Sequence, residues 1–438
     1  MKGKSSTFQI ILLCAFGAIG VAAVLIFALA TAGNSGGGVA PVTIWGTLDA
    51  TTMKNVLRAA AEQDSRLSEV TYVQKNASTF ETDLSNALAS GSGPDLFILR
   101  GDEAMSDASK IYAIPYSSLT QSQFQTTFVS GANQLLGQNG AIGIPILVDP
   151  LVLYWNTDVL ASAGIAQPPQ YWDQVPGDVE KMTVKDNSGV LQRQGIALGT
   201  YQNINAAKDV LAMFIEQAGG QITAQNASGT VVPALSSGGS ASNAATQALE
   251  FYTEFANPSQ PDYSWNDAQV DARQAFAAST LAMYIGYASE DPQIVAANPN
   301  LTFAAASMPQ IRNSQTSIDE GVVYALAIPR NDPNLSSALT VAYLIASEPV
   351  DAALSQSYGL APARRDAISA NSQATSTANA NLSLFDKMAL VVHSWYDPNP
   401  AQTGPIFQAM IEDTESGAIQ AQDAVGRANQ QIGNLLQQ

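Results

Sequence analysis

Residues 145–165 read PILVDPLVLYWNTDVLASAGI, and this stretch decides the fold. An apolar extended segment is interrupted by one acid, Asp149, and ends in an aromatic pair followed by an asparagine. The pattern then predicts a short helix that stops at Gly164. After a double proline the chain resumes at Trp172-Asp173, so a long buried strand leads directly into helical structure.

The composition indicates a large globular protein. The chain has 438 residues, too many for one compact core, so we expect two domains. Hydrophobic residues make up 46% and charged residues 13%, which suits a well-packed protein and argues against disorder. The formal net charge of −18 speaks against nucleic acid or anionic lipid headgroups as the main partner, because both would be repelled.

Cysteine and histidine are nearly absent. The only cysteine, Cys14, lies in the apolar N-terminal run, and the only histidine is His393. Metal sites built from these residue types are therefore nearly excluded, although a site made only of oxygen ligands is not. We expect no cofactor, and we find no nucleophile elbow, zinc-binding histidine pair or phosphate loop.

The N-terminus predicts a membrane segment. Lys2 and Lys4 precede an uncharged run over residues 8–32. Roughly 20 apolar residues span a bilayer, whereas the apolar core of a signal peptide has about 7–15. We expect residues 1–32 to anchor the chain, with the lysines in the cytoplasm and everything after Gly33 outside, and we expect a flexible linker over residues 33–40. The alternative is cleavage near Ala28-Leu29-Ala30, which would make the protein secreted or periplasmic.

Strand and helix patterns alternate on both sides of residues 145–165, which implies parallel pairing with right-handed crossovers. The predicted strands are 42–45, 70–73, 95–99, 195–199, 281–285 and 322–328. The predicted helices are 53–60, 80–88, 210–218, 244–255, 335–346 and 350–358. Residues 406–436 read as two helices with a break near Ser416-Gly417.

Residues 145–165 closely resemble the segment that crosses between the lobes of extracellular solute-binding proteins of sugar-type ABC importers, the maltose-binding-protein-like class. Three further motifs carry the resemblance, which covers nearly all of residues 42–436. Gly91-Ser92-Gly93-Pro94-Asp95 is similar to Gly-x-Gly-Pro-Asp, and Ala282-Met283 with Gly286 resembles Ala-Met-x-x-x-Gly with one residue fewer before the glycine. The run from Gly359 to Arg364 is similar to Gly-x-Leu-Pro-Ala-Arg, with the departure Leu-Ala-Pro-Ala-Arg.

The resemblance implies a type II periplasmic-binding-protein fold: two discontinuous α/β lobes with a hinged ligand cleft, crossed near residues 147–150, 307–309 and 360–363. Lobe 1 would comprise residues 41–148 and 308–362, and lobe 2 residues 149–307 and 363–438. Such a protein is a non-enzymatic monomer that hands a carbohydrate to membrane permease subunits.

The resemblance also implies ligand-binding residues in both lobes and at the crossing. They are Trp45, Thr47, Arg100, Asp102, Asp149, Tyr201, Asn203, Asn205, Tyr287 and Trp395. These residue types suit a sugar, because carboxylates, amides and guanidinium groups pair with hydroxyls while aromatic faces cover C–H surfaces. Each neutral hydrogen bond contributes only about 0.5–1.5 kcal/mol, so both lobes must contribute.

Several alternatives stay open. Asp149 is either a ligand contact or a hinge or helix-capping acid, and Asn203 and Asn205 are either contacts or turn residues. A polyamine could use Asp102 and Asp149 with aromatic walls. A glycoside hydrolase would need two carboxylates about 5–5.5 Å or about 6.5–9.5 Å apart. An anchored surface adhesin would share the N-terminal tether.

Overall fold

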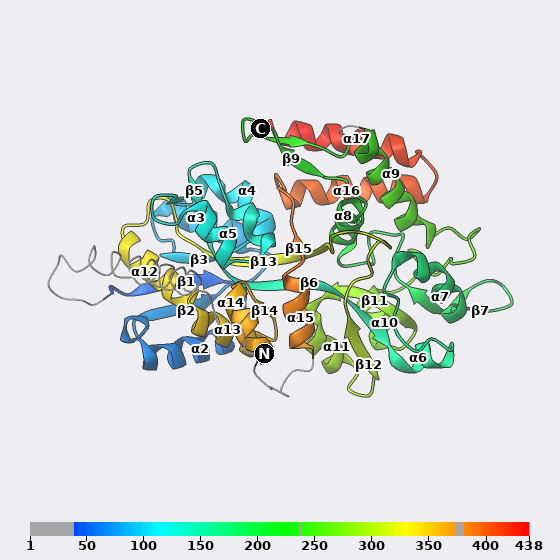
Figure 1. Cartoon of the computed structure of the whole chain (residues 1–438), viewed down its shortest axis with the longest axis horizontal. Coiled ribbons are helices and arrows are strands. Elements are labelled where there is room, and N and C mark those ends of the chain that lie inside the picture. The colour runs from blue at the N-terminus through cyan, green and yellow to red at the C-terminus, as the bar shows by residue number, and fades with distance from the viewer. Residues whose placement is uncertain (1–38, 237–238, 374–380, 438) are drawn as a thin grey trace, which may run out of the picture.

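The computed structural model describes residues 39–236, 239–373 and 381–437. Two α/β halves lie side by side in Figure 1, and most of their strands belong to one sheet of 11 strands, with two further sheets of two strands each. The main path of the sheet runs β2-β1-β3-β13-β6-β11-β8-β7. β12 and β14 also pair with β6, and β15 pairs with β13.

The long strand β6 (Ile144–Asn156) belongs to both halves. Its first part pairs antiparallel with β13 (Asp319–Ala327) and with β14 (Ala361–Pro362). Its second part pairs antiparallel with β11 (Leu281–Tyr287) and β12 (Phe303–Ala306). The stretch that decides the fold is therefore one continuous strand that carries the chain from one half into the other.

A weak point in the hydrogen-bond ladder lies near the middle of β6. Pro150 stands opposite Gly321 of β13, and proline has no N–H to donate. A Cβ atom added to Gly321 would lie 2.8 Å from the carbonyl oxygen of Asp149 and 2.8 Å from the Cα of Pro150. Only glycine allows the two strands to approach this closely.

The first half is built on three parallel strands, β1 (Val42–Gly46), β2 (Val70–Gln74) and β3 (Leu96–Arg100). Helix α2 (Ala50–Gln63) packs on them because its apolar residues recur on one face, and Asp49 caps its N-terminus. The other elements here are α3 (Phe80–Ser90), α4 (Ala104–Asp107), β4 (Ile114–Pro115), α5 (Gln121–Thr127), β5 (Gly140–Ala141), α12 (Leu335–Ile345), α13 (Glu348–Tyr358) and α14 (Arg365–Gln373).

The second half contains β8 (Leu191–Ile196) parallel to β11, with α8 (Ala207–Gln217) beside the middle of the molecule. Helices α16 (Pro400–Glu415) and α17 (Ala421–Leu435) pack against α9 (Gly239–Glu254) and form the upper edge of Figure 1. The other elements here are α6 (Thr157–Ser162), α7 (Val175–Met182), β7 (Val184–Lys185), β9 (Thr223–Gln225), β10 (Val231–Pro233), α10 (Ala272–Ala277) and α11 (Asp291–Ala297).

The last passage between the halves runs through the centre. Helix α15 (Leu382–Ala389) packs on β6, and β15 (Val392–His393) pairs in parallel with the start of β13. Before this passage, α14 packs against α13 and α5 of the first half. The assignment of residues 363–438 to lobe 2, like the other lobe boundaries, stays a prediction.

The mixed α/β class expected from the sequence is confirmed, and most predicted elements coincide with observed ones. Parallel pairing holds for β1, β2 and β3, for β8 with β11 and for β13 with β15, whereas β6 runs antiparallel to its neighbours and β13 runs antiparallel to β3 and β6. The strand predicted at 195–199 is displaced, since β8 runs from Leu191 to Ile196 and Gly199 adopts a φ of 104° in the loop that follows.

The predicted N-terminal anchor and most of the linker lie outside the described residues. Within the part that the structure describes, no helix is long and apolar enough to cross a membrane.

Candidate functional site

Charged and aromatic residues from the two halves face one another where the halves meet. Arg100, at the end of β3, donates from Nε and Nη2 to Asp102 over 3.1 and 3.0 Å. Tyr287, at the exit of β11, donates its hydroxyl to Asp209 over 2.5 Å. Burial raises the pKa of Asp209, and the charges of Lys208, Asp102 and Arg100 also act on it. We name these five residues the central cluster.

Tyr287 is held by three contacts, two at its backbone and one at its ring hydroxyl. Its backbone N–H donates to Glu290 over 3.1 Å, and its carbonyl oxygen accepts from the hydroxyl of Tyr154 at 2.9 Å. The third contact is the bond from its own hydroxyl to Asp209. Tyr287 is therefore oriented before any ligand arrives.

Lys208 links the start of α8 to the segment that precedes α16. Its Nζ donates to the carboxylate of Asp397 and, over 2.9 Å, to the hydroxyl of Thr403. Burial lowers the pKa of Lys208, but the charges of Asp397 and Asp209 outweigh that effect and raise it. The same Nζ lies 5.2 Å from the ring centroid of Trp395, which is only 6% exposed. In this arrangement Trp395 supports Lys208.

Asp149 lies on β6 and is 3% exposed. Its Oδ1 accepts a hydrogen bond of 2.9 Å from the backbone N–H of Ser289, at the start of the turn after β11. Burial raises the pKa of Asp149 to about 6, against the lowering effect of its bonds to Ser289. These contacts support the capping alternative, and a role in ligand contact stays a prediction.

The loop that follows β8 uses Asn203 internally. The amide nitrogen of Asn203 donates to the carbonyl oxygens of Asn266 and Gln269 over 3.0 and 3.1 Å. Its amide oxygen accepts from the hydroxyl of Thr200 and from the indole N–H of Trp265. These bonds favour the turn alternative for Asn203.

Two other predicted contacts follow Gly199 and lie nearer the surface. Asn205 is exposed, and Tyr201 is half-buried with its hydroxyl beside Gly404 of α16. Neither side chain belongs to the hydrogen-bond network of Asn203. A ligand contact therefore stays a prediction for both residues.

Trp45 lies near the carboxyl end of β1, and Thr47 follows the strand. The Nζ of Lys75 lies 3.4 Å from the ring centroid of Trp45 and covers one face of the ring. Trp45 pairs in register with Phe97 of β3, the strand that ends at Arg100, so both chain ends meet at the same edge of the sheet. Thr47 is half-buried beyond this edge.

The sequence reasoning missed three residues near the cluster. Lys208 and Asp209 open the helix directly after the predicted ligand loop, and that position is a signal that could have found them. Tyr324 of β13 lies opposite Arg100, and the charges of Asp149, Arg100 and Asp102 act on its pKa. No sequence signal reveals Tyr324, because its placement depends on antiparallel pairing of distant strands.

Three buried acids lie beside the cluster, on α8 and at the start of β13. Asp319 is 0% and Glu320 6% exposed, and within the described residues one oxygen of each, and one of Glu216, has no hydrogen-bond partner. Burial raises the pKa of all three, that of Glu216 to about 7. The Nδ1 of His393 lies 4.0 Å from Glu216. No group of three His, Cys, Asp or Glu side chains in the described part of the chain is arranged to hold a metal ion.

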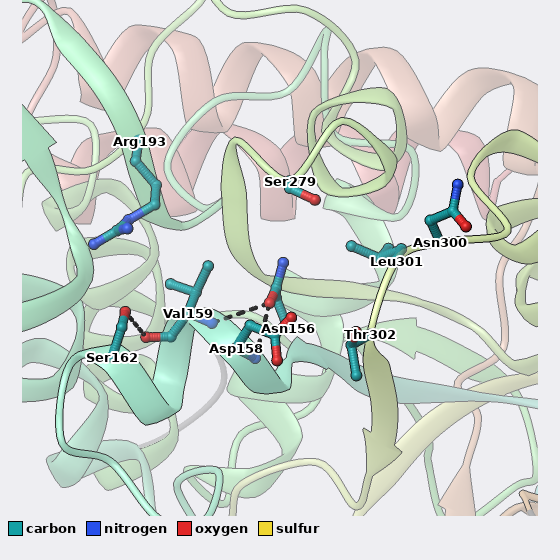
Figure 2. Close-up of a pocket in the computed structure, with 9 residues that line it drawn as sticks. All are labelled: Asn156, Asp158, Val159, Ser162, Arg193, Ser279, Asn300, Leu301 and Thr302. Carbon is teal, nitrogen blue, oxygen red and sulfur yellow. Dashed lines mark hydrogen bonds between the residues drawn. The ribbon is translucent and has the colours of Figure 1, made fainter.

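A separate surface pocket of about 300 Å³ lies in the second half (Figure 2). Its lining includes Asn156, whose side chain caps α6 through the N–H groups of Asp158 and Val159. Arg193 at its edge donates from Nε to the carbonyl oxygen of Met182 over 2.9 Å. None of the predicted ligand residues lines this pocket, so we place the candidate site at the central cluster.

Two α/β halves that share a long crossing strand, with polar residues facing one another where they meet, define a solute-binding protein of the periplasmic type. Residues 49–348 match the model of the bacterial extracellular solute-binding protein family. The chain belongs to this family, whose members bind solutes and are not enzymes. No functionally curated protein matches the sequence.

Solved structures of low identity share the fold along nearly the whole chain. The cyclic α-maltosyl-1,6-maltose binding protein of Arthrobacter globiformis has a TM-score of 0.74 and 15% identity, and the match covers 91% of this chain and 99% of that one. A cyclo/maltodextrin-binding protein complexed with maltotetraose has a TM-score of 0.73 and 14% identity, covering 92% and 99%. An ABC transporter solute-binding protein of Thermotoga lettingae, bound with α-D-tagatose, has a TM-score of 0.67 and 21% identity, covering 90% and 99%.

Proposed function

We propose that the chain captures a carbohydrate between its two halves and delivers it to the permease of an ABC importer. The observation that supports this most is the central cluster, in which Arg100 and Asp102 of one half face Asp209 and Tyr287 of the other. Hydroxyl groups both donate and accept, so a sugar would find partners on both sides. Two of the three named structural neighbours are named for the sugar that they bind, and the third was solved with α-D-tagatose bound.

Binding would proceed by closure of the halves around β6 and β13. A ligand favours the closed state only by its differential affinity for that state, so residues of both halves must contact it. We assign direct contact to Arg100, Asp102 and Tyr287, which are already oriented by bonds within the protein. Pre-orientation lowers the entropy cost of binding.

The remaining predicted residues would act around this centre. Trp45 and Thr47 would close one end of the site, and Tyr201 and Asn205 the other. Trp395, Asp149 and Asn203 would position Lys208, the loop after β11 and the loop after β8, through the contacts described above.

The protein would work as a monomer outside the cytoplasm, tethered by the predicted helix of residues 1–32 or released if that segment is cleaved. Its carbohydrate-loaded form would be the one recognised by the permease. A polyamine solute and a surface adhesin without a transport partner are the competing functions, and the polyamine is tested below.

Thermal-shift measurements on the purified full chain would test this function. The predicted N-terminal membrane segment requires a detergent, which must lack a sugar headgroup. The panel of ligands would hold mono- and oligosaccharides, polyamines, amino acids and short peptides. A ligand present at about 100 times its Kd adds about 2.7 kcal/mol to stability, which gives a clear shift. A shift by one carbohydrate group supports the proposal. A shift by polyamines or amino acids alone, or by nothing in the panel, contradicts it.

A further inference from the structure

The site is richer in carboxyl groups than in cations. The residues whose charges act on one another there include the acids Asp102, Asp149, Asp209, Glu320 and Asp397 and the cations Arg100 and Lys208. Asp149, Glu320 and Asp397 are buried, where charges interact more strongly than in water, while the side chain of Asp102 is 34% exposed. The excess of acid is therefore separate from the general acidity of the surface.

Both cations are already paired. Arg100 makes two bonds to Asp102, and Lys208 donates to Asp397 and Thr403. An anionic ligand would have to compete with these carboxylates for the same N–H groups. It would also be repelled by the acids that surround them.

Within the described residues, Asp149, Asp209 and Glu320 form no ion pair, although the charge of Arg100 acts on Asp149 and those of Lys208 and Arg100 act on Asp209. Asp209 accepts from the hydroxyl of Tyr287, and Asp149 accepts from the backbone N–H of Ser289. One oxygen of Glu320 has no hydrogen-bond partner among the described residues. Buried acids without a counter-charge are costly, so a bound cation would stabilise the site.

From this arrangement we infer that the solute is a carbohydrate that carries a basic nitrogen, and that sugar acids are rejected. The inference rests on the proposed function and narrows its ligand class. An ammonium group on the sugar would lie among Asp102, Asp209 and Glu320, while the hydroxyls would bond to Arg100 and Tyr287.

Proton release follows from the same arrangement. Burial raises the pKa of Asp209 and of Glu320, so these groups hold protons more readily than exposed acids. A bound ammonium group lowers the pKa of nearby carboxyls. Binding of an amino sugar would therefore release protons, whereas binding of the matched neutral sugar would release fewer.

The test is calorimetric titration of the full chain with matched ligand triples: glucosamine, glucose and glucuronate, and galactosamine, galactose and galacturonate. Oligomers of each type and spermidine would complete the panel. Within a triple that binds, we expect the amino sugar to bind at least about tenfold tighter than the sugar acid, with the neutral sugar between them. Titration in two buffers of different ionisation enthalpy would measure the proton release.

Two variants test whether the negative charges of the acids cause the preference for amino sugars over sugar acids. Asp209→Asn keeps an acceptor for Tyr287 and should lower the preference for the amino sugar several-fold. Asp102→Asn frees the guanidinium of Arg100 and should strengthen binding of the sugar acid. Glu62→Gln is the matched control, because it removes one charge from an exposed position on α2 and should leave the preference unchanged.

The outcomes are distinct. A sugar acid that binds as tightly as its neutral counterpart, or an unchanged preference in both site variants, overturns the inference while the carbohydrate function stands. Binding of spermidine with silence from every sugar overturns the carbohydrate function itself and favours a polyamine. Silence from the whole panel overturns both proposals.

Discussion

Single side chains at the centre of the molecule are held by bonds within the protein, and this limits what each can offer a ligand. Asp149 accepts from Ser289, and Asn203 uses both ends of its amide in the loop after β8. Both were predicted from the sequence as ligand contacts. A carboxylate or amide in a family motif can thus serve the loop that shapes a site as well as the ligand within it.

Asp149 can be tested by two substitutions. We expect Asp149→Ala to lower the free energy of unfolding by about 1–3 kcal/mol, because the buried N–H of Ser289 loses its acceptor. Asp149→Asn keeps an acceptor oxygen and should cost less. Chemical denaturation of the empty protein measures both. Unchanged stability of the alanine variant with weakened ligand binding would instead make Asp149 a direct contact.

Lys208 should matter more for stability than an ordinary surface lysine. The side chain of Lys208 is 13% exposed and that of Asp397 only 2%, so Lys208→Met leaves a buried carboxylate without its cation. We expect a loss of about 3–5 kcal/mol in the free energy of unfolding. Combining it with Asp397→Asn should recover part of that loss.

The exposed pair of Arg66 and Asp64 provides the control for this prediction. Their side chains are 48% and 30% exposed, so Arg66→Met should cost no more than about 1 kcal/mol. Equal losses for Lys208→Met and Arg66→Met, measured by the same denaturation curves, would show that the central pair contributes little.

At the scale of elements, the start of β13 and the end of α8 make stability depend on pH. Burial raises the pKa of Asp319, Glu320 and Glu216 above their ordinary values. In the pH interval between the ordinary and the raised pKa values, the folded chain therefore holds more protons than the unfolded chain. Stability therefore falls as pH rises through the interval. We expect the Tm of the empty protein to increase when the pH is lowered from about 7.5 to about 5.5.

Glu320→Gln should flatten this dependence, since the amide cannot ionise. The exposed Glu62→Gln should leave the dependence of Tm on pH as it is in the unchanged chain. A Tm that rises toward high pH would mean that these acids are ionised and compensated in the folded protein.

Most elements could be predicted from the sequence because their signals are local. The buried face of α2, the end of α6 before Gly164 and the break between α16 and α17 all follow from periodicity and glycine positions. The position of Tyr324 beside Arg100 and the pairing of β15 with β13 depend on contacts between residues far apart in the chain. Local patterns carry no information on such contacts. The sequence therefore predicted site residues at strand ends, such as Arg100 and Tyr287, but not the residue Tyr324 that lies opposite Arg100 on another strand.

At the scale of the whole molecule, β6 makes the two halves one folding unit. Each half would lose part of its sheet if the other unfolded, because β6 pairs with strands of both. We therefore expect one thermal transition. Single-tryptophan variants that retain Trp45 in the first half or Trp265 in the second should report the same midpoint by fluorescence. Two separate midpoints would show that the halves unfold independently.

The pairing of Pro150 with Gly321 has a mechanical consequence. A strand that rotates about its own axis must stretch the hydrogen bonds on either side of the rotation, and Pro150, which stands opposite Gly321, has no N–H to donate. Rotation of one half against the other can then concentrate at this position while the neighbouring rungs keep their geometry. β6 would then twist mainly at this one position. Closing of the two halves would therefore store little strain energy in the sheet, and opening would release little.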